Sequence, residues 1–150
     1  MAAKVGIGRT VIAASLGLVG AAASVRAQEP APGPAPVASM SRLMVDFIYP
    51  ASDAVFYIES RTPQSGEEWN ELVGWTLMLA ESANLLMAPG RAYDQDQWMR
   101  DAALMRAAGA AAYEAARNRD LAALVALSDP LYESCTTCHQ HYRPEYRGVR

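Results

Sequence analysis

Lysine, cysteine and histidine are scarce in this 150-residue chain: lysine occurs once, and cysteine and histidine occur twice each. Strand-like alternation of apolar and polar residues is missing, and no segment repeats. An apolar stretch near the N-terminus, residues 11–23, has 13 residues, whereas a helix that crosses a bilayer takes roughly 20. These absences argue against a strand-based or repeat architecture and against this stretch as a membrane span.

Residues 1–27 have the layout of a secretory signal peptide. Lys4 and Arg9 form its positive end, residues 11–23 form its apolar centre, and segment 24–27 supplies small residues where a signal peptidase reads them. No cysteine follows the apolar centre directly, which excludes a lipoprotein anchor. The sequence therefore predicts export to the periplasm, with no stable membrane anchor.

Residues 28–39 should form a tether before a single domain at 40–150. Prolines at alternate positions from Pro30 to Pro36 remove amide donors and favour extended polyproline geometry. The mature chain would begin at Gln28, with 10 basic and 16 acidic residues and a net charge of −6. This sign argues against nucleic acid as a partner.

Four helical segments are predicted, at about residues 40–60, 65–87, 94–118 and 120–143, from apolar residues at three- and four-residue steps. The apolar face of the first comprises Met40, Met44, Phe47, Ile48, Ala51, Val55 and Ile58. The face of the third comprises Trp98, Ala102, Met105, Gly109, Ala112 and Ala116. The face of the third helix consists mostly of small side chains, so a partner helix or a flat cofactor can approach it closely.

Local signals mark the helix ends. The sequence from Ser65 to Glu68 matches a capping box, and the Pro89-Gly90 pair should end the second helix. Pro50 lacks the amide that would bond to the carbonyl of Asp46, so it should bend or break the first helix. The fourth helix should kink or restart at residues 128–130. Four helices joined by short loops are expected to pack as an all-α, antiparallel bundle.

Several other residues are expected to serve the fold rather than chemistry. His141 should be exposed, since two positions along a helix turn it away from His139. Acidic residues near the third helix should form a solvated helix start, and three aromatic residues should pack. These residues are Asp94, Asp96 and Asp101, and Trp75, Trp98 and Tyr142.

The two cysteines and the following histidine form the most specific pattern in the chain. Cys135, Thr136, Thr137, Cys138 and His139 make a C-x-x-C-H motif, the attachment signature of c-type haem. The two thiols form thioethers with the porphyrin vinyl groups, and the imidazole binds iron. On a helix these three positions share one face. Export strengthens the interpretation, because bacteria attach this haem outside the cytoplasmic membrane.

Three other interpretations of the motif remain open from the sequence. A thioredoxin-like redox pair would need a strand–helix–strand context, whereas these surroundings are helical. A zinc site could use Cys135, Cys138, His139 and His141, although the histidines lie too close behind the cysteines for the usual ligand spacing. A structural disulfide between the two cysteines is the third. No Ser-His-Asp or Cys-His nucleophile set is apparent, so no enzyme activity is expected.

The chain resembles the cytochrome c prime family of periplasmic haem proteins. The resemblance rests on the signal peptide, the four helices and a C-terminal helix with C-x-x-C-H, Tyr142-Arg143 after it and Pro130 before it. It implies one covalent haem c near the C-terminal helix of the bundle. It also implies that Cys135 and Cys138 bind the haem, that His139 is its proximal ligand, and that Arg143 lies near the haem edge or the imidazole.

The sixth iron position distinguishes two kinds of protein in that family. In one kind an apolar side chain of the first helix blocks the position, and in the other a methionine fills it. The segment Arg42-Leu43-Met44 resembles the methionine-ligated kind, with Met44 as ligand and Met40, one turn earlier, as the reserve. The alternative interpretation is that Met44 is ordinary core.

Two functions follow from these alternatives. A methionine-ligated haem suits an electron carrier that cycles between Fe(III) and Fe(II), whereas five-coordinate haem suits the binding of nitric oxide or carbon monoxide. The expected partners are redox proteins that the sequence does not identify, and it leaves a homodimer open. The mature chain lacks lysine, so it has no lysine ring for docking an acidic redox partner.

Overall fold

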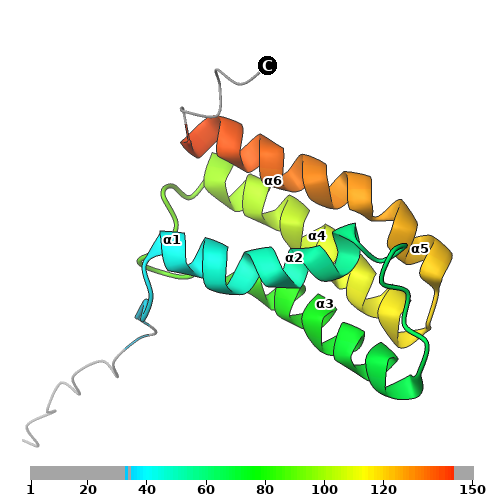
Figure 1. Cartoon of the computed structure of the whole chain (residues 1–150). Helices are drawn as coiled ribbons and strands as arrows, with labels where there is room; N and C mark the ends of the chain where they lie inside the picture. The colour runs from blue at the N-terminus through cyan, green and yellow to red at the C-terminus, as the bar shows by residue number, and fades with distance from the viewer. Residues whose placement is uncertain (1–32, 34, 144–150) are drawn as a thin grey trace, which may run out of the picture. The chain divides into compact units, whose positions relative to one another are not determined.

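The computed structural model describes Gly33 and residues 35–143. The predicted signal peptide and half of the predicted tether, residues 28–32 and 34, lie outside the described residues. Within them every regular element is helical (Figure 1). The elements are α1 (Met40–Leu43), a π-helix η1 (Met44–Ile48), α2 (Tyr49–Phe56), α3 (Gly66–Met87), α4 (Gln97–Arg117), α5 (Leu121–Ala126) and α6 (Ser128–Tyr142).

The first predicted helix is a continuous segment, α1–η1–α2, which ends at Phe56 rather than near residue 60, and Pro50 does not break it. The amide of Tyr49 donates to the carbonyl of Met44, five residues back, as a π turn requires. Pro50 then stands in the first turn of α2, where its missing amide hydrogen is not needed. The helix therefore does not break at Pro50. Its irregularity is a π turn just before Pro50.

The π turn also corrects the predicted apolar face of this segment. Ile48, Ala51, Val55 and Ile58 are buried as expected, but Phe47 is 36% exposed. Leu43, which the four-residue spacing missed, is buried. The extra residue accommodated by a π turn shifts the face, so that residues before the turn no longer follow the α-helical period.

The ends of α3 and α6 follow the predicted signals. Ser65 caps α3, its hydroxyl oxygen accepting the Glu68 amide at 3.1 Å, and Gly90 after α3 adopts a positive φ of 80°. The fourth predicted helix restarts where expected: α5 ends at Ala126 and α6 begins at Ser128.

The third predicted helix begins three residues later than expected, at Gln97. A carboxylate oxygen of Asp94 accepts the amide hydrogens of Asp96 and Trp98 at 2.9 and 3.0 Å. Asp94 is therefore a capping residue outside the helix, because its side chain replaces carbonyl partners that the first turn lacks.

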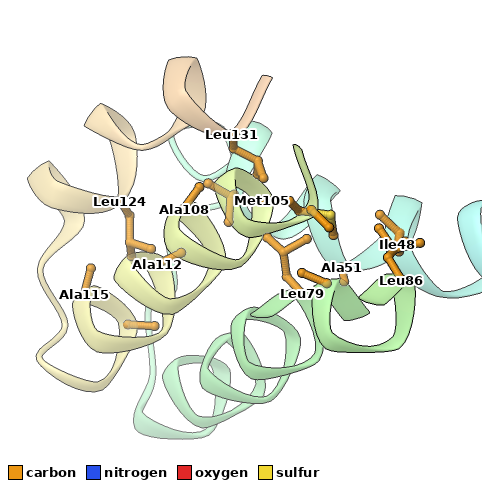
Figure 2. Packing of buried hydrophobic residues seen from close by; sticks show 14 of the residues in the cluster. Ile48, Ala51, Leu79, Leu86, Met105, Ala108, Ala112, Ala115, Leu124 and Leu131 are labelled. Atoms are coloured by element: carbon orange, nitrogen blue, oxygen red, sulfur yellow. The ribbon is translucent and has the colours of Figure 1, made fainter. Parts of the chain in front are cut away.

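Four helical units pack against one another: the first segment, α3, α4 and the α5–α6 pair. Figure 2 shows the buried side chains where they meet. All six residues of the predicted α4 face are buried. Among the described residues, no helix has the length and apolar character needed to cross a membrane.

Gly109 allows α3 and α4 to approach closely, as the small face of α4 predicts. A Cβ atom at Gly109 would lie 2.8 Å from the Cα and 2.9 Å from the amide nitrogen of Ala80 in α3. Both atoms belong to backbone, which cannot rotate away as a side chain can. A larger residue would therefore push the two helices apart.

Gly109→Ala should lower the free energy of unfolding by about 1–3 kcal/mol, because overpacking outweighs the gain in helix propensity. The control is Gly74→Ala in α3, where a Cβ would meet no atom within 4 Å. That change should raise the free energy of unfolding by up to about 1 kcal/mol. Urea unfolding measures both, and equal stabilisation by the two variants would contradict the close approach.

Candidate functional site

The three residues of the attachment motif lie on α6. Cys135, Cys138 and His139 are half-buried, and their spacing of three and four residues places them on one side of the helix. Both cysteines are free thiols, and Cys138 packs against the apolar core. The structure thus brings together two thiols and an imidazole without a disulfide.

Burial disfavours the ionised form of both thiols. It raises the pKa of the Cys135 thiol above its ordinary value. The pKa of Cys138 is raised to about 11, first by burial and then by the carboxylate of Asp101 and by Cys135. A thiolate is the form that attacks disulfides and other electrophiles, so these cysteines are poorly suited to thiol–disulfide exchange.

The start of α6 contacts the first segment. At the start of α6, the Ser128 hydroxyl donates to the carbonyl of Val55 in α2 at 3.5 Å. Cys135 is seven residues and His139 eleven residues beyond Ser128, two and three helical turns along the same flank. Cys138 lies between these positions and is near enough to Asp101 of α4 for that carboxylate to raise its pKa.

The other flank of α6 packs against α4. A cavity of about 390 Å³ lies between them, lined by Leu104, Ala108 and Ala111 of α4 and by Pro130, Ser134 and Thr137 of α6. A second cavity of the same volume lies between α2 and α3. The motif cysteines and His139 line neither cavity.

Asp101 is buried, which corrects its predicted place in a solvated helix start. Its side chain is 1% exposed. Gln97 donates to one carboxylate oxygen at 2.8 Å, and Nδ1 of His141 lies 2.7 Å from the other. His141 is exposed as predicted, yet it reaches back to α4. The signal in the sequence was the spacing of Asp101 from Gln97 and Met105, four residues on either side, beside the apolar face of α4.

A second contact joins the end of α6 to the residues before α4. The Tyr142 hydroxyl donates to the carboxylate of Asp94, and the Tyr142 ring lies 4.9 Å from Trp98 and 5.5 Å from Tyr93, centroid to centroid. The indole of Trp98 also donates to the Leu86 carbonyl at 2.8 Å. Trp98 and Tyr142 pack as predicted, while sequence reasoning missed Tyr93.

Hydrogen bonding and burial shift two pKa values in this contact. Burial, followed by the bond to Asp94, raises the pKa of Tyr142 to about 12. The same bond, followed by the Trp98 amide, lowers the pKa of Asp94. Ionisation of Tyr142 is therefore disfavoured in the folded chain. The protonated Tyr142 contributes to the free energy of unfolding below pH 10.0, and this contribution is lost as pH rises from 10.0 through about 12.

The remaining predicted site residues lie on the first segment and at the end of α6. Met40 and Met44 are half-buried and pack against the core, with Met44 in the π turn. Arg143 is exposed just after α6, and its amide donates to the carbonyl of His139 at 2.8 Å. Arg143 therefore follows His139 by one helical turn.

The alternatives for the motif find little support in the described part of the chain. No group of three or more histidine, cysteine, aspartate or glutamate side chains among residues 33 and 35–143 is arranged to hold a metal ion. Those residues also contain no strand, so the strand–helix–strand context of a thioredoxin-like pair is missing there. The motif places two thiols and one imidazole on α6, and a c-type haem would need these same residue types.

Comparison of the whole chain with protein-family models, with characterised proteins and with solved structures finds no match.

Asp94→Asn should lower the pKa of Tyr142 from about 12 without restoring the ordinary value, because burial still disfavours the phenolate. The difference in tyrosinate absorbance between each chain and its Tyr142→Phe counterpart gives this pKa. Asp96→Asn is the matched control, since Asp96 pairs with Arg100 instead. An unchanged Tyr142 pKa in Asp94→Asn would show that the contact does not persist in solution.

Proposed function

We propose that this protein is a periplasmic c-type cytochrome with one covalent haem, held by Cys135 and Cys138 and ligated by His139. The observation that carries the proposal is the pair of free, half-buried thiols at the attachment spacing on α6, with the imidazole next to them. The resemblance of the sequence to the cytochrome c prime family and the predicted export signal support it.

The proposed architecture is an antiparallel four-helix bundle with the haem near α6. Contacts between helix ends support the alternating direction. The start of α4 meets the end of α3 through Trp98 and Leu86. The residues before α4 meet the end of α6 through Asp94 and Tyr142. The start of α6 meets α2 through Ser128 and Val55.

We propose that Met44 would be the second residue to bind the iron, because of its level along the bundle. The contact between Ser128 and Val55 is a common reference point. His139 lies eleven residues after Ser128, and Met44 lies eleven residues before Val55, roughly 16 Å along each helix. In Figure 1 the first segment begins at the end of the molecule where α6 finishes. Met40 lies one turn further out and matches this level less well.

The chain's own residues would hold and orient the cofactor. Haem iron supplies reversible one-electron cycling when it is bound, and a thioether opposite an imidazole favours the ferrous form. Asp101 contacts His141, and Asp94 accepts a hydrogen bond from Tyr142. His141 and Tyr142, which follow His139 on α6, are therefore bonded to α4 and to the residues before it. Arg143, one turn beyond His139, adds a positive charge at the exposed end of α6. None of these roles requires substrate chemistry, which fits an electron carrier.

One observation favours a second candidate, a five-coordinate haem protein that binds nitric oxide or carbon monoxide. Leu43 is only 5% exposed, whereas its neighbour Met44 is half-buried. An apolar side chain at the inward position would block the sixth site without ligating iron. The visible spectrum separates the candidates, because low-spin bands belong to the carrier and high-spin bands to the gas binder.

The proposed partners are redox proteins in the periplasm. The net charge of −6 on the mature chain favours a partner surface of the opposite sign over an acidic one or nucleic acid. A homodimer is compatible with the proposal and is not required by it.

Protein made in a host with haem-maturation machinery should stay coloured after denaturation and extraction with organic solvent. Cys135→Ala combined with Cys138→Ala should release the colour to the solvent, because no thioether remains. Thr136→Ala, between the two cysteines, should retain it. Covalent haem in the double variant, or extractable haem in the unaltered chain, would refute the attachment site.

Met44→Ala should leave the haem attached but convert the iron to high spin, since a neutral thioether ligand is lost. The variant should also have a lower reduction potential and bind carbon monoxide more readily. Met40→Ala should do little by comparison. Visible spectra and redox titration measure these effects. A high-spin Met40→Ala beside an unchanged Met44→Ala would move the ligand one turn earlier, and a high-spin unaltered protein would favour the gas binder.

A further inference from the structure

The π turn begins at Met44, the proposed iron ligand. An α-helix through this region would need the amide of residue 50 to donate to the carbonyl of Asp46, and Pro50 has no amide hydrogen. Instead the Tyr49 amide bonds to the Met44 carbonyl, five residues back. The π turn covers Met44 to Ile48 and ends two residues before Pro50.

The five-residue step of this turn decides which side chain faces the core. Four residues before Ile48, the α-helical period would place Met44 inward. In the structure the buried residue before Ile48 is Leu43, five positions back, with 5% exposure against 6% for Ile48. Met44 is left half-buried at the margin of the core. In an α-helical turn the two neighbours would therefore exchange places.

We infer that Pro50 is a positioning residue: by maintaining the π turn, it directs Leu43 into the core and keeps Met44 at its margin. The consequence for iron rests on the proposed function. With haem bound, a marginal Met44 would be a weakly held ligand open to displacement by an external gas, whereas an inward Met44 would be held firmly. Pro50 would thus set the balance between the electron carrier and the gas binder.

Cysteine labelling tests the orientation without any haem. Leu43→Cys and Met44→Cys are introduced separately into the full-length chain with Cys135→Ser and Cys138→Ser, and the labelling rate of each single thiol is measured. The thiol of Leu43→Cys should react about tenfold more slowly than the thiol of Met44→Cys, as the deeper burial of position 43 predicts. Adding Pro50→Ala should reverse the order, since the α-helical turn can then form. Pro89→Ala, in the exposed loop after α3, should leave the order unchanged.

The haem-loaded protein provides the second measurement. Pro50→Ala should weaken carbon monoxide binding on the order of tenfold, because the gas must displace a more firmly held Met44. Met44→Ala in the same chain should abolish this difference, and circular dichroism checks that each variant retains its helix content. Equal labelling of the two positions, or an order that Pro50→Ala does not change, would overturn the inference. Normal labelling results with no covalent haem would instead refute the proposed function alone.

Discussion

The side-chain bonding of α6 to α4 and to the residues before it is the interaction on which the candidate site depends. A buried carboxylate is costly unless it is hydrogen-bonded, and Asp101 meets this requirement with Gln97 on its own helix and His141 on α6. Tyr142 adds a second bond across the same junction, to Asp94. These two residues follow His139 almost directly, so the bonds fix the turn of α6 that carries the imidazole. Cys138, one residue before it, packs into the core from the same turn.

Two sides of the bundle differ in their contacts. On one side, α3 and α4 meet backbone to backbone at Gly109 and Ala80, and α6 is bonded to the region of α4. On the other side, the first segment carries a π turn and is joined to α6 by the bond from Ser128 to Val55 at 3.5 Å. The proposed haem would attach to α6, and the residues proposed to face its iron come from the first segment.

Sequence reasoning predicted what depends on local chemistry. Ser65 caps α3, and α6 restarts just before Pro130, because capping and proline effects act within one turn. The α4 face was predicted because its period is regular through Gly109. The departures arose where a tertiary contact or a changed period decides the outcome. Burial of Asp101 depends on His141, 40 residues away, and Leu43 is inward because of a π turn that an α-helical period does not contain.

The candidate site divides in the same way. Cys135, Cys138 and His139 share a helix, so their spacing alone predicts a common side, and the structure places them together on α6. Met44 and Leu43 compete for a position that depends on the register of another helix. A spacing rule therefore predicts that the three motif residues share one side of α6, but it does not predict which residue of another helix lies inward.

Mass spectrometry tests the central claim most directly. The chain is exported by a host that matures c-type haem, and it is then digested before the measurement. The peptide that contains Cys135 and Cys138 should carry the mass of one haem, with neither cysteine available to a thiol reagent. The same peptide at its unmodified mass, with two free thiols or a disulfide, would contradict the account.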